Sequence, residues 1–363
     1  MQVRLLRSVT LASLLALSAA SACSQDSKTH ASFTVTGVGG DGGGGAGTGG
    51  TGASNVDAGT GGSTSTNTDG SVADGMGTTT GCGQDPGQDY GKYVEFHMNV
   101  AGPDSDTTNK LKVRDRIYYV RLPKTYDSST PTRVVYLGPG CGGTTSGDVI
   151  NLNLAAAEQA ILVAIIPVQT QPGSTAPPEF GQCFDERPAS VEYPFFDALH
   201  KKIESTYCVD PARQFYAGFS TGARLGNMLG CKFPDVLRAF ATVQGALPPL
   251  PTCTDHPVAN FTLADTLESG NPYQANVMAS QHVLAANKCS DPTASPSTPP
   301  PKTETYDPGT MAACTGYGGA INCVDFTGCD KNYPVVFCTT TGAGHTPCEN
   351  WSDFAFWNFF KKF

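Results

Sequence analysis

Positive charge is scarce in this chain of 363 residues. Lysine and arginine together number 23 against 32 aspartates and glutamates, which gives a formal net charge of -9. Without a basic surface the chain has no field to hold a polyanion, so nucleic-acid binding is not an expected function. Zinc-type spacings are also missing, because none of the 13 cysteines belongs to a CxxC or HxxxC pattern. The sequence therefore predicts no metal site.

Long apolar runs are confined to the N-terminus. Two arginines precede the apolar run 9–20, and small residues follow it up to Cys23. This pattern is typical of a bacterial export signal over residues 1–22, with Cys23 as a site of lipid modification. Cleavage by an ordinary signal peptidase after Ala22 is the alternative. No later stretch of about 20 apolar residues is present, so a lipid at Cys23 is the one membrane attachment we expect.

Aromatic residues are absent between residues 37 and 81, where 18 of 45 residues are glycine. Such a composition cannot bury enough apolar surface to offset the chain entropy of folding. We therefore predict a flexible tether over residues 23–81 and a folded domain over residues 82–363. Twelve cysteines follow Cys23, and an even number in an exported chain suits up to six disulfides. The expected location is the outer surface or the extracellular medium.

Strands and helices alternate through most of the folded domain. This alternation favours a mostly parallel sheet with helices on both faces, and antiparallel strands followed by βα repeats predict the α/β-hydrolase fold. Between Cys289 and Cys329 the alternation stops, and six prolines from 292 to 308 predict a long surface loop. Strands are expected at 93–99, 115–122, 132–137, 161–166, 214–218, 238–244, 258–263 and 335–339, and helices at 149–159, 191–207, 220–232, 274–287 and from 351.

The strongest chemical signal is the sequence Gly218-Phe219-Ser220-Thr221-Gly222, which lies between a predicted strand and a predicted helix. A G-x-S-x-G pattern at such a junction is typical of a nucleophile elbow. The turn forces Ser220 into a strained conformation, and glycines on either side avoid collisions with the neighbouring strand and helix. The hydroxyl then lies at a helix N-terminus, where negative charge is stabilised. A glycine-rich packing turn is the alternative interpretation.

A serine hydroxyl needs a base to remove its proton, and hydrolases of this order place an acid and then a histidine downstream. Three histidines follow Ser220. His256 lies beside a predicted strand and His282 within a predicted helix, where packed or exposed histidines are common. His345 lies in a glycine-rich loop between the last predicted strand and the last helix. His345 is therefore the predicted base.

Two carboxylates follow the predicted strand 258–263 and compete for the role of the acid. Asp265 stands directly at the strand end, where turn and capping residues are common, whereas Glu268 lies further into the loop, from which a side chain can reach the histidine. Glu268 is the predicted acid, with Asp265 as the alternative.

An oxyanion hole requires two backbone NH groups aimed at the developing charge. One is expected from Thr221, the residue after the nucleophile. The other is expected from Cys141, within the glycine-rich loop 140–143 that follows the strand 132–137. The alternative is that Cys141 is only a disulfide partner. The two roles are compatible, because the oxyanion hole needs only the backbone NH of Cys141.

These residues resemble the secreted polyhydroxybutyrate depolymerase and feruloyl esterase group of α/β hydrolases over residues 82–363. One departure is Pro139, which stands where the group usually has a histidine. An ungapped register over 257–272 puts Glu268 on the group's acid position, and the resemblance implies a disulfide between Cys289 and Cys329. The resemblance rests on the segment 116–127, the loop 140–143, Tyr207-Cys208-Val209-Asp210, the elbow 218–222, Phe233-Pro234-Asp235 and the loop 342–346.

The resemblance implies an exported serine esterase that forms an acyl-enzyme and needs no cofactor. The implied substrates are feruloyl or related esters of plant polysaccharide, with polyhydroxyalkanoates such as polyhydroxybutyrate as the alternative. A peptidase of the same fold is disfavoured, because no propeller or cap domain is visible in the sequence. The competing class is a non-catalytic surface lipoprotein that uses the fold for binding, and the intact Ser220 and His345 weigh against it.

Overall fold

The structure is a computed structural model that describes residues 78–101, 113–150, 152, 156, 158–167, 183–186, 188, 190–245, 256–295, 314 and 321–363. The predicted signal, Cys23 and the tether up to residue 77 lie outside the described residues, as do residues 151, 153–155 and 157 of the helix expected at 149–159. None of the helices in the described part is long and apolar enough to cross a membrane. The elements in chain order are β1 (Tyr93–Ala101), β2 (Val113–Arg121), β3 (Thr132–Gly138), β4 (Ala160–Ile165), α2 (Glu192–Thr206), β5 (Val209–Phe219), α3 (Thr221–Lys232), β6 (Ala239–Val243), β7 (Ala259–Asp265), α4 (Tyr273–Ala286), β8 (Asn322–Asp325), β9 (Val335–Thr340) and α5 (Glu349–Phe360).

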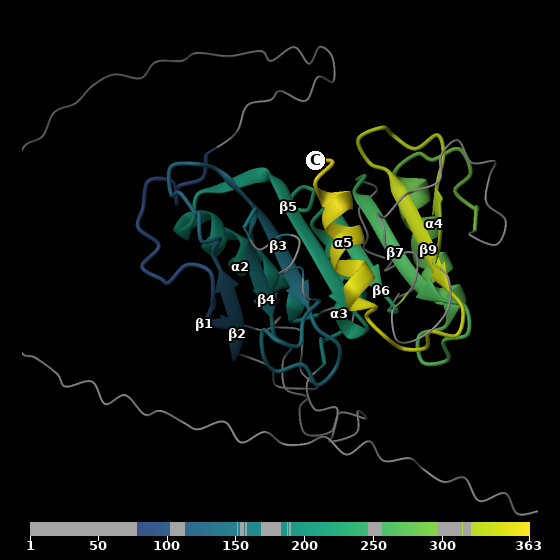
Figure 1. Cartoon of the computed structure of the whole chain (residues 1–363), viewed down its shortest axis with the longest axis horizontal. Coiled ribbons are helices and arrows are strands. Elements are labelled where there is room, and N and C mark those ends of the chain that lie inside the picture. The colour runs from purple at the N-terminus through teal and green to yellow at the C-terminus, as the bar shows by residue number, and fades with distance from the viewer. Residues whose placement is uncertain are drawn as a thin grey trace, which may run out of the picture. The chain divides into compact units, whose positions relative to one another are not determined.

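The strands form one sheet in the order β1-β2-β4-β3-β5-β6-β7-β9-β8 (Figure 1). Strand β2 pairs antiparallel with both β1 and β4, and β8 pairs antiparallel with β9 at the other edge. All pairs from β4 through β3, β5, β6 and β7 to β9 are parallel. The predicted mostly parallel sheet is therefore confirmed.

The centre of the sheet is buried. Every residue of β4, β6 and β7 is buried, as expected for parallel strands that are covered on both sides. Neighbouring residues of a strand point in opposite directions. Val134 and Tyr136 of β3 pack in a core with residues of α2, α3 and α4, whereas Val135 and Leu137 pack in a second core with residues of α5.

One expectation about the late loop was wrong. Within the segment 289–329 the structure forms strand β8, which lies antiparallel to β9. Cys323 of β8 is bonded to Cys338 of β9, so a crosslink holds this short edge strand in register. A strand of four residues shows too little alternation to be recognised among prolines and glycines. Strand β5 also begins earlier than predicted, at Val209 rather than at residue 214.

Disulfides join five pairs of described cysteines. Cys289 is bonded to Cys329, the pair that the family resemblance implies. Cys231 is also disulfide-bonded. The other pairs are Cys82–Cys208, Cys141–Cys183, Cys314–Cys348 and Cys323–Cys338.

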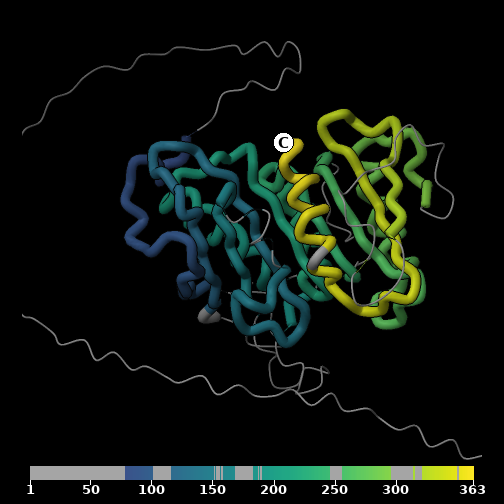
Figure 2. The backbone as a smooth tube through the Cα atoms, in the orientation of Figure 1, coloured from purple at the N-terminus to yellow at the C-terminus, as the bar shows by residue number. Residues whose placement is uncertain are grey.

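The topology brings three distant loops to one edge of the sheet. Strands β5, β7 and β9 are parallel, so their carboxyl ends lie at the same edge. Figure 2 shows the yellow C-terminal strand beside the green β7, although about 70 residues separate them in the chain. Ser220 follows β5, Glu268 follows β7 and His345 follows β9.

Helix α5 buries a carboxyl group. Asp353 is 3% exposed, and its Oδ1 has no hydrogen-bond partner among the described residues. Burial, and to a smaller extent the charge of Glu349, raises the pKa of Asp353 to about 8. The folded state therefore favours the protonated, neutral form of Asp353. The unfolded chain ionises at its ordinary pKa, so the free energy of unfolding declines as the pH rises from about 4 to about 8.

Replacing Asp353 by asparagine should stabilise the protein at pH 9 and have little effect at pH 4.5. The amide stays neutral at both values, so the variant avoids the ionisation that destabilises the wild type. We expect a gain of about 3–5 kcal/mol in the free energy of unfolding at pH 9. Calorimetry at the two pH values measures the change, with the exposed Asp235→Asn as a control. The same change at both pH values would contradict the expectation.

Candidate active site

Ser220 occupies a strained turn between β5 and α3. Its φ is 55° and its ψ is -119°, a conformation that a residue with a Cβ adopts only when the surroundings impose it. A Cβ on Gly218 would collide with the backbone of Gly222, and a Cβ on Gly222 would collide with the backbone of Gly138 in β3. The NH of Ser220 donates to the carbonyl of Val243 at 2.9 Å. Close backbone contacts therefore hold the turn in place.

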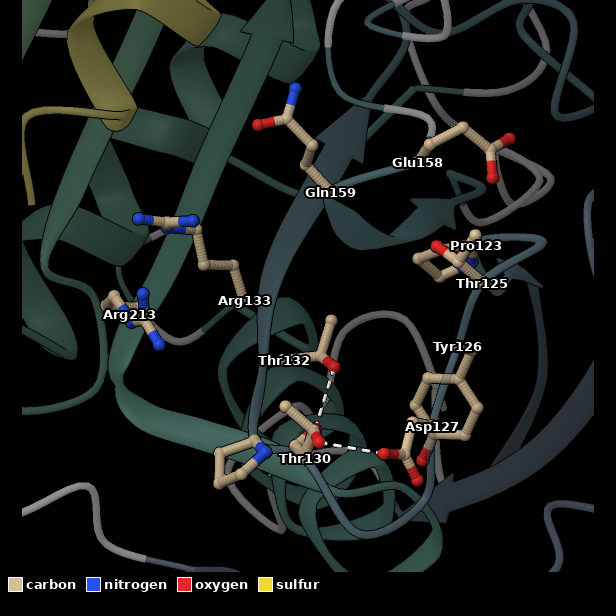
Figure 3. Close-up of a pocket in the computed structure, with 11 residues that line it drawn as sticks. Pro123, Thr125, Tyr126, Asp127, Thr130, Thr132, Arg133, Glu158, Gln159 and Arg213 are labelled. Atoms are coloured by element: carbon tan, nitrogen blue, oxygen red, sulfur yellow. Dashed lines mark hydrogen bonds between the residues drawn. The ribbon is translucent and has the colours of Figure 1, made fainter.

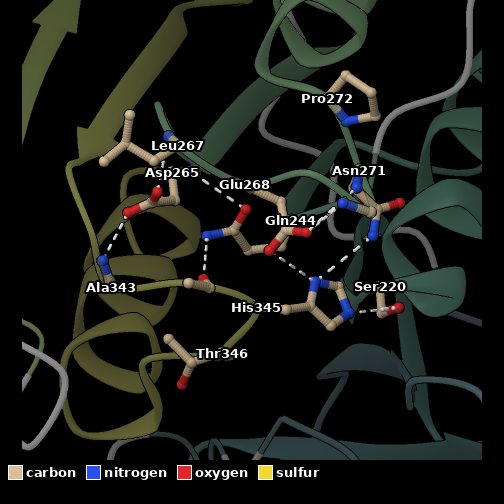
Figure 4. A network of polar contacts seen from close by, with 12 residues as sticks. Ser220, Gln244, Asp265, Leu267, Glu268, Asn271, Pro272, Ala343, His345 and Thr346 are labelled. Carbon is tan, nitrogen blue, oxygen red and sulfur yellow. Dashed lines mark hydrogen bonds and ion pairs between the residues drawn. The ribbon is translucent and has the colours of Figure 1, made fainter. Parts of the chain in front are cut away.

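His345 lies next to the serine hydroxyl (Figure 4). Its Nε2 is 2.9 Å from Oγ of Ser220, which is hydrogen-bond distance. The ring of Phe219 lies 4.8 Å from the imidazole, centroid to centroid, and the side-chain amide of Gln244 donates to the carbonyl of Gly344 at 3.0 Å. The His345 side chain is 39% exposed. The imidazole is thus held on the protein side and open to solvent on the other.

Glu268 is the carboxylate that faces His345. Its Oε2 lies 3.4 Å from Nδ1 of the imidazole, and the side chain is 6% exposed. Its Oε1 accepts the backbone NH groups of Gly270 at 2.6 Å and Asn271 at 3.3 Å. The loop therefore orients one carboxylate oxygen with its own backbone and leaves the other for the histidine. Contacts of this length are common in substrate-free sites and tighten in complexes.

Asp265, the alternative acid, points away from His345 (Figure 4). It is fully buried, and its Oδ2 accepts the hydroxyl of Thr340 and the NH of Ala343, each at 2.8 Å. Its Oδ1 accepts the NH of Leu267 at 2.8 Å. Burial raises the pKa of Asp265, but these hydrogen bonds outweigh it and bring the pKa below its ordinary value. Asp265 thus braces the loops after β7 and β9.

The other two candidate histidines lie elsewhere in the fold. His256 is 3.2 Å from the carboxylate of Asp235 on the surface, and His282 lies within α4. The structure therefore brings together Ser220, His345 and Glu268 from the predicted set.

Both segments expected to supply an oxyanion hole lie beside Ser220. Thr221 is the first residue of α3, where a backbone NH has no acceptor within the helix. In the other loop, a Cβ built on Gly140 would lie 3.4 Å from Cβ of Ser220. The next residue, Cys141, is bonded to Cys183. Cys141 is thus a disulfide partner, which leaves its NH available for the predicted role.

Four polar residues around the site were missed from the sequence: Gln244, Glu186, Arg224 and Asn271. Gln244 holds the end of β7, from which the loop of Glu268 starts, because its Oε1 accepts the NH of Asp265 at 3.1 Å. Arg224 could have been found from its spacing. It follows Ser220 by four residues in a predicted helix, and side chains four residues apart in a helix are neighbours. Glu186 and Asn271 lie in loops without a pattern.

A separate pocket of about 390 Å³ lies at the opposite edge of the parallel strands, where β3 begins (Figure 3). Its acidic groups already have partners, because Asp127 accepts the hydroxyl of Thr130 and Glu158 accepts a guanidinium NH of Arg121. None of its described lining residues is serine, histidine or cysteine. The described part of the chain also contains no cluster of metal-ligating side chains. Among the described residues, the candidate nucleophile and base therefore lie at Ser220 and not in this pocket.

No protein-family model matches the chain. The chain is similar to feruloyl esterase C of Emericella nidulans, with 24% identity over 268 residues that cover 70% of this chain and 87% of that protein. It is also similar to feruloyl esterase D of Neurospora crassa, with 22% identity over 295 residues that cover 78% and 90%. Among solved structures, a CE1 ferulic acid esterase from Anaeromyces mucronatus in complex with ferulic acid aligns with a TM-score of 0.44 and 14% identity, over 77% of this chain and 92% of that one.

Replacing Asp265 by asparagine should lower stability more than activity. An amide offers one acceptor oxygen, so it cannot satisfy the donors on both sides of the carboxylate and leaves a buried donor unpaired. We expect a loss of about 1–3 kcal/mol in the free energy of unfolding at pH 7, measured by denaturant titration. Turnover of the folded variant should fall by less than about tenfold.

The pH dependence of this loss follows from the lowered pKa of Asp265. The advantage of the wild type is complete above the ordinary pKa of an aspartate, about 4, and declines as the pH falls through the folded-state pKa. Unchanged stability together with a thousandfold loss of turnover would instead make Asp265 the acid.

Proposed function

We propose that the protein is an exported serine esterase of the α/β-hydrolase fold, with helices on both faces of the sheet, that acts on feruloyl or related esters of plant polysaccharide. The observation that carries the proposal is the 2.9 Å contact between Nε2 of His345 and Oγ of Ser220, a serine held at positive φ. Similarity to fungal feruloyl esterases over most of the chain supports the substrate class.

Acylation begins when His345 takes the proton of the Ser220 hydroxyl through Nε2. The serine oxygen attacks the ester carbonyl, and the NH groups of Thr221 and Cys141 bind the oxyanion of the tetrahedral intermediate. Glu268 accepts a hydrogen bond from the Nδ1–H group of His345, remains ionised and so stabilises the imidazolium. The N-terminus of α3 adds a favourable partial charge at the same place.

Collapse of this intermediate breaks the ester bond. The imidazolium of His345 donates its Nε2 proton to the leaving alkoxide, which departs as an alcohol and leaves the acyl group on Ser220. A water molecule then gives a proton to Nε2 and attacks the acyl carbonyl. The second intermediate releases the carboxylic acid and restores the serine hydroxyl. The cycle uses no cofactor.

The disulfides support the exported location in the proposal. Such crosslinks persist in oxidising compartments and are rare in a reducing cytosol. Five of them join described residues of this chain. The lipid anchor at Cys23 belongs to the same proposal and rests on the N-terminal sequence alone.

Activity of the purified protein on a panel of esters tests the proposed function. We expect the highest kcat/KM on methyl ferulate, lower values on short p-nitrophenyl esters, and little release from hydroxybutyrate oligomers. Ser220→Ala should lower turnover at least ~10³-fold without unfolding, because the site residues act as a unit. Equal activity in a folded Ser220→Ala variant contradicts the serine mechanism. A preference for hydroxybutyrate oligomers would replace feruloyl esters by polyhydroxyalkanoates as the substrate class.

Glu268→Gln tests the role of the acid. The amide keeps the shape of the side chain and removes the charge that supports the imidazolium. We expect a loss of ~10³ to 10⁴-fold in kcat, as removal of this charge produces in other serine triads. The expected difference from Asp265→Asn is ~3 kcal/mol in transition-state stabilisation, measured on one soluble ester. If kcat of Glu268→Gln falls by less than tenfold, Glu268 is not the acid of the mechanism.

A further inference from the structure

Arg224 connects three segments of the site through a single guanidinium group. Its Nε and Nη2 donate to Oδ1 of Asn271 at 3.0 and 2.5 Å, and its Nη1 donates to Oε2 of Glu186 at 2.8 Å. The other oxygen of Glu186 accepts the hydroxyl of Thr221 at 3.0 Å. Arg224 lies in the first turn of α3, one helical turn from Ser220. The guanidinium therefore ties the serine helix to the loop after β7.

The guanidinium also decides which end of the Asn271 amide faces His345. An arginine side chain only donates hydrogen bonds, so the atom of Asn271 that receives its two NH groups is the oxygen. The nitrogen, Nδ2, then lies 3.4 Å from Nδ1 of His345 (Figure 4). Asn271 is 7% exposed. A buried amide with its oxygen held twice loses both hydrogen bonds if it flips.

This orientation matters for the proton on Nδ1. For Nε2 to accept the Ser220 proton, Nδ1 of His345 must carry a hydrogen and donate it. Among the described residues, two side chains face Nδ1, Glu268 through Oε2 and Asn271 through Nδ2, each at 3.4 Å. An amide nitrogen is a donor, so Glu268 is the acceptor between the two. A flipped Asn271 would offer a neutral carbonyl oxygen in competition with the carboxylate.

We propose that Arg224 is a positioning residue that locks the Asn271 amide with its nitrogen toward His345, so that the Nδ1–H group of His345 donates its hydrogen bond to Glu268. The proposal rests on the proposed esterase function. It assigns Arg224 an effect on the hydrogen bond of the histidine, and not only on the cohesion of the loops. Glu186 holds the guanidinium from the other side.

The test is a mutant cycle with Arg224→Met, Asn271→Leu and the double variant, measured on one soluble ester. Arg224→Met frees the amide to flip, and we expect kcat/KM to fall about tenfold, because a charge-assisted hydrogen bond is replaced in part by a neutral one. Asn271→Leu removes the competing oxygen, so the double variant should recover to within about threefold of Asn271→Leu alone. Arg224→Lys retains a donor and should lose less activity than Arg224→Met.

Lys232→Met, in the last turn of the same helix, is the matched control for loss of a cation and should leave kcat/KM unchanged. A purely structural role for Arg224 predicts a double variant as poor as Arg224→Met or worse, and that result would overturn the proposal. Melting temperatures of all variants show which of them fold.

A spectroscopic measurement separates this proposal from the esterase proposal. The Nδ1 proton of a histidine bound to a carboxylate gives a low-field NMR resonance, which Glu268→Gln assigns by abolishing it. We expect this resonance to move upfield or broaden in Arg224→Met and to return in the double variant. An unchanged resonance in Arg224→Met overturns the positioning role, whereas absence of activity in wild type and Lys232→Met on every ester would overturn only the esterase function.

Discussion

Three backbone segments approach one another around Ser220 so closely that side chains have no room between them. The end of β3 at Gly138, the end of β5 at Gly218 and the first turn of α3 at Gly222 are in mutual contact. The hydroxyl of Tyr216 donates to the carbonyl of Gly222 at 2.7 Å and joins strand and helix from inside the core. The strained φ of Ser220 persists because these contacts allow no relaxed alternative. The remaining side chains of the site are therefore arranged around a fixed point, as precise chemistry requires.

Two carboxylates only three residues apart have different surroundings, and this difference separates their roles. Asp265 ends β7 inside the protein and receives hydrogen bonds from Thr340, Ala343 and Leu267 through both oxygens. Glu268 lies where the loop turns back, so its backbone contacts use one oxygen and the other faces His345. A carboxylate whose oxygens are both engaged acts as a brace, whereas one with an uncommitted oxygen is available to a titrating neighbour.

The parts of the fold that could be predicted from the sequence are those with local causes. Alternating elements indicated the parallel sheet, and the glycines around Ser220 and His345 indicated two turns at the ends of strands. Strand β8 was missed because its stability comes from β9 and from the Cys323–Cys338 bond, neither of which is visible locally. Glu186 and Asn271 were missed for the same reason, since their polar partners lie 38 and 47 residues away along the chain.

Crosslinks concentrate on the loops that carry the site. His345 lies between Cys338 and Cys348, which are bonded to Cys323 and Cys314, and the loop beside Ser220 is bonded through Cys141 to Cys183. Ordering a loop costs conformational entropy whenever it happens. Here much of that ordering takes place once, when the thiols are oxidised, and not at each encounter with a ligand. The disulfides therefore restrain the loop of His345 before any ligand arrives, which lowers the conformational entropy that binding has to remove.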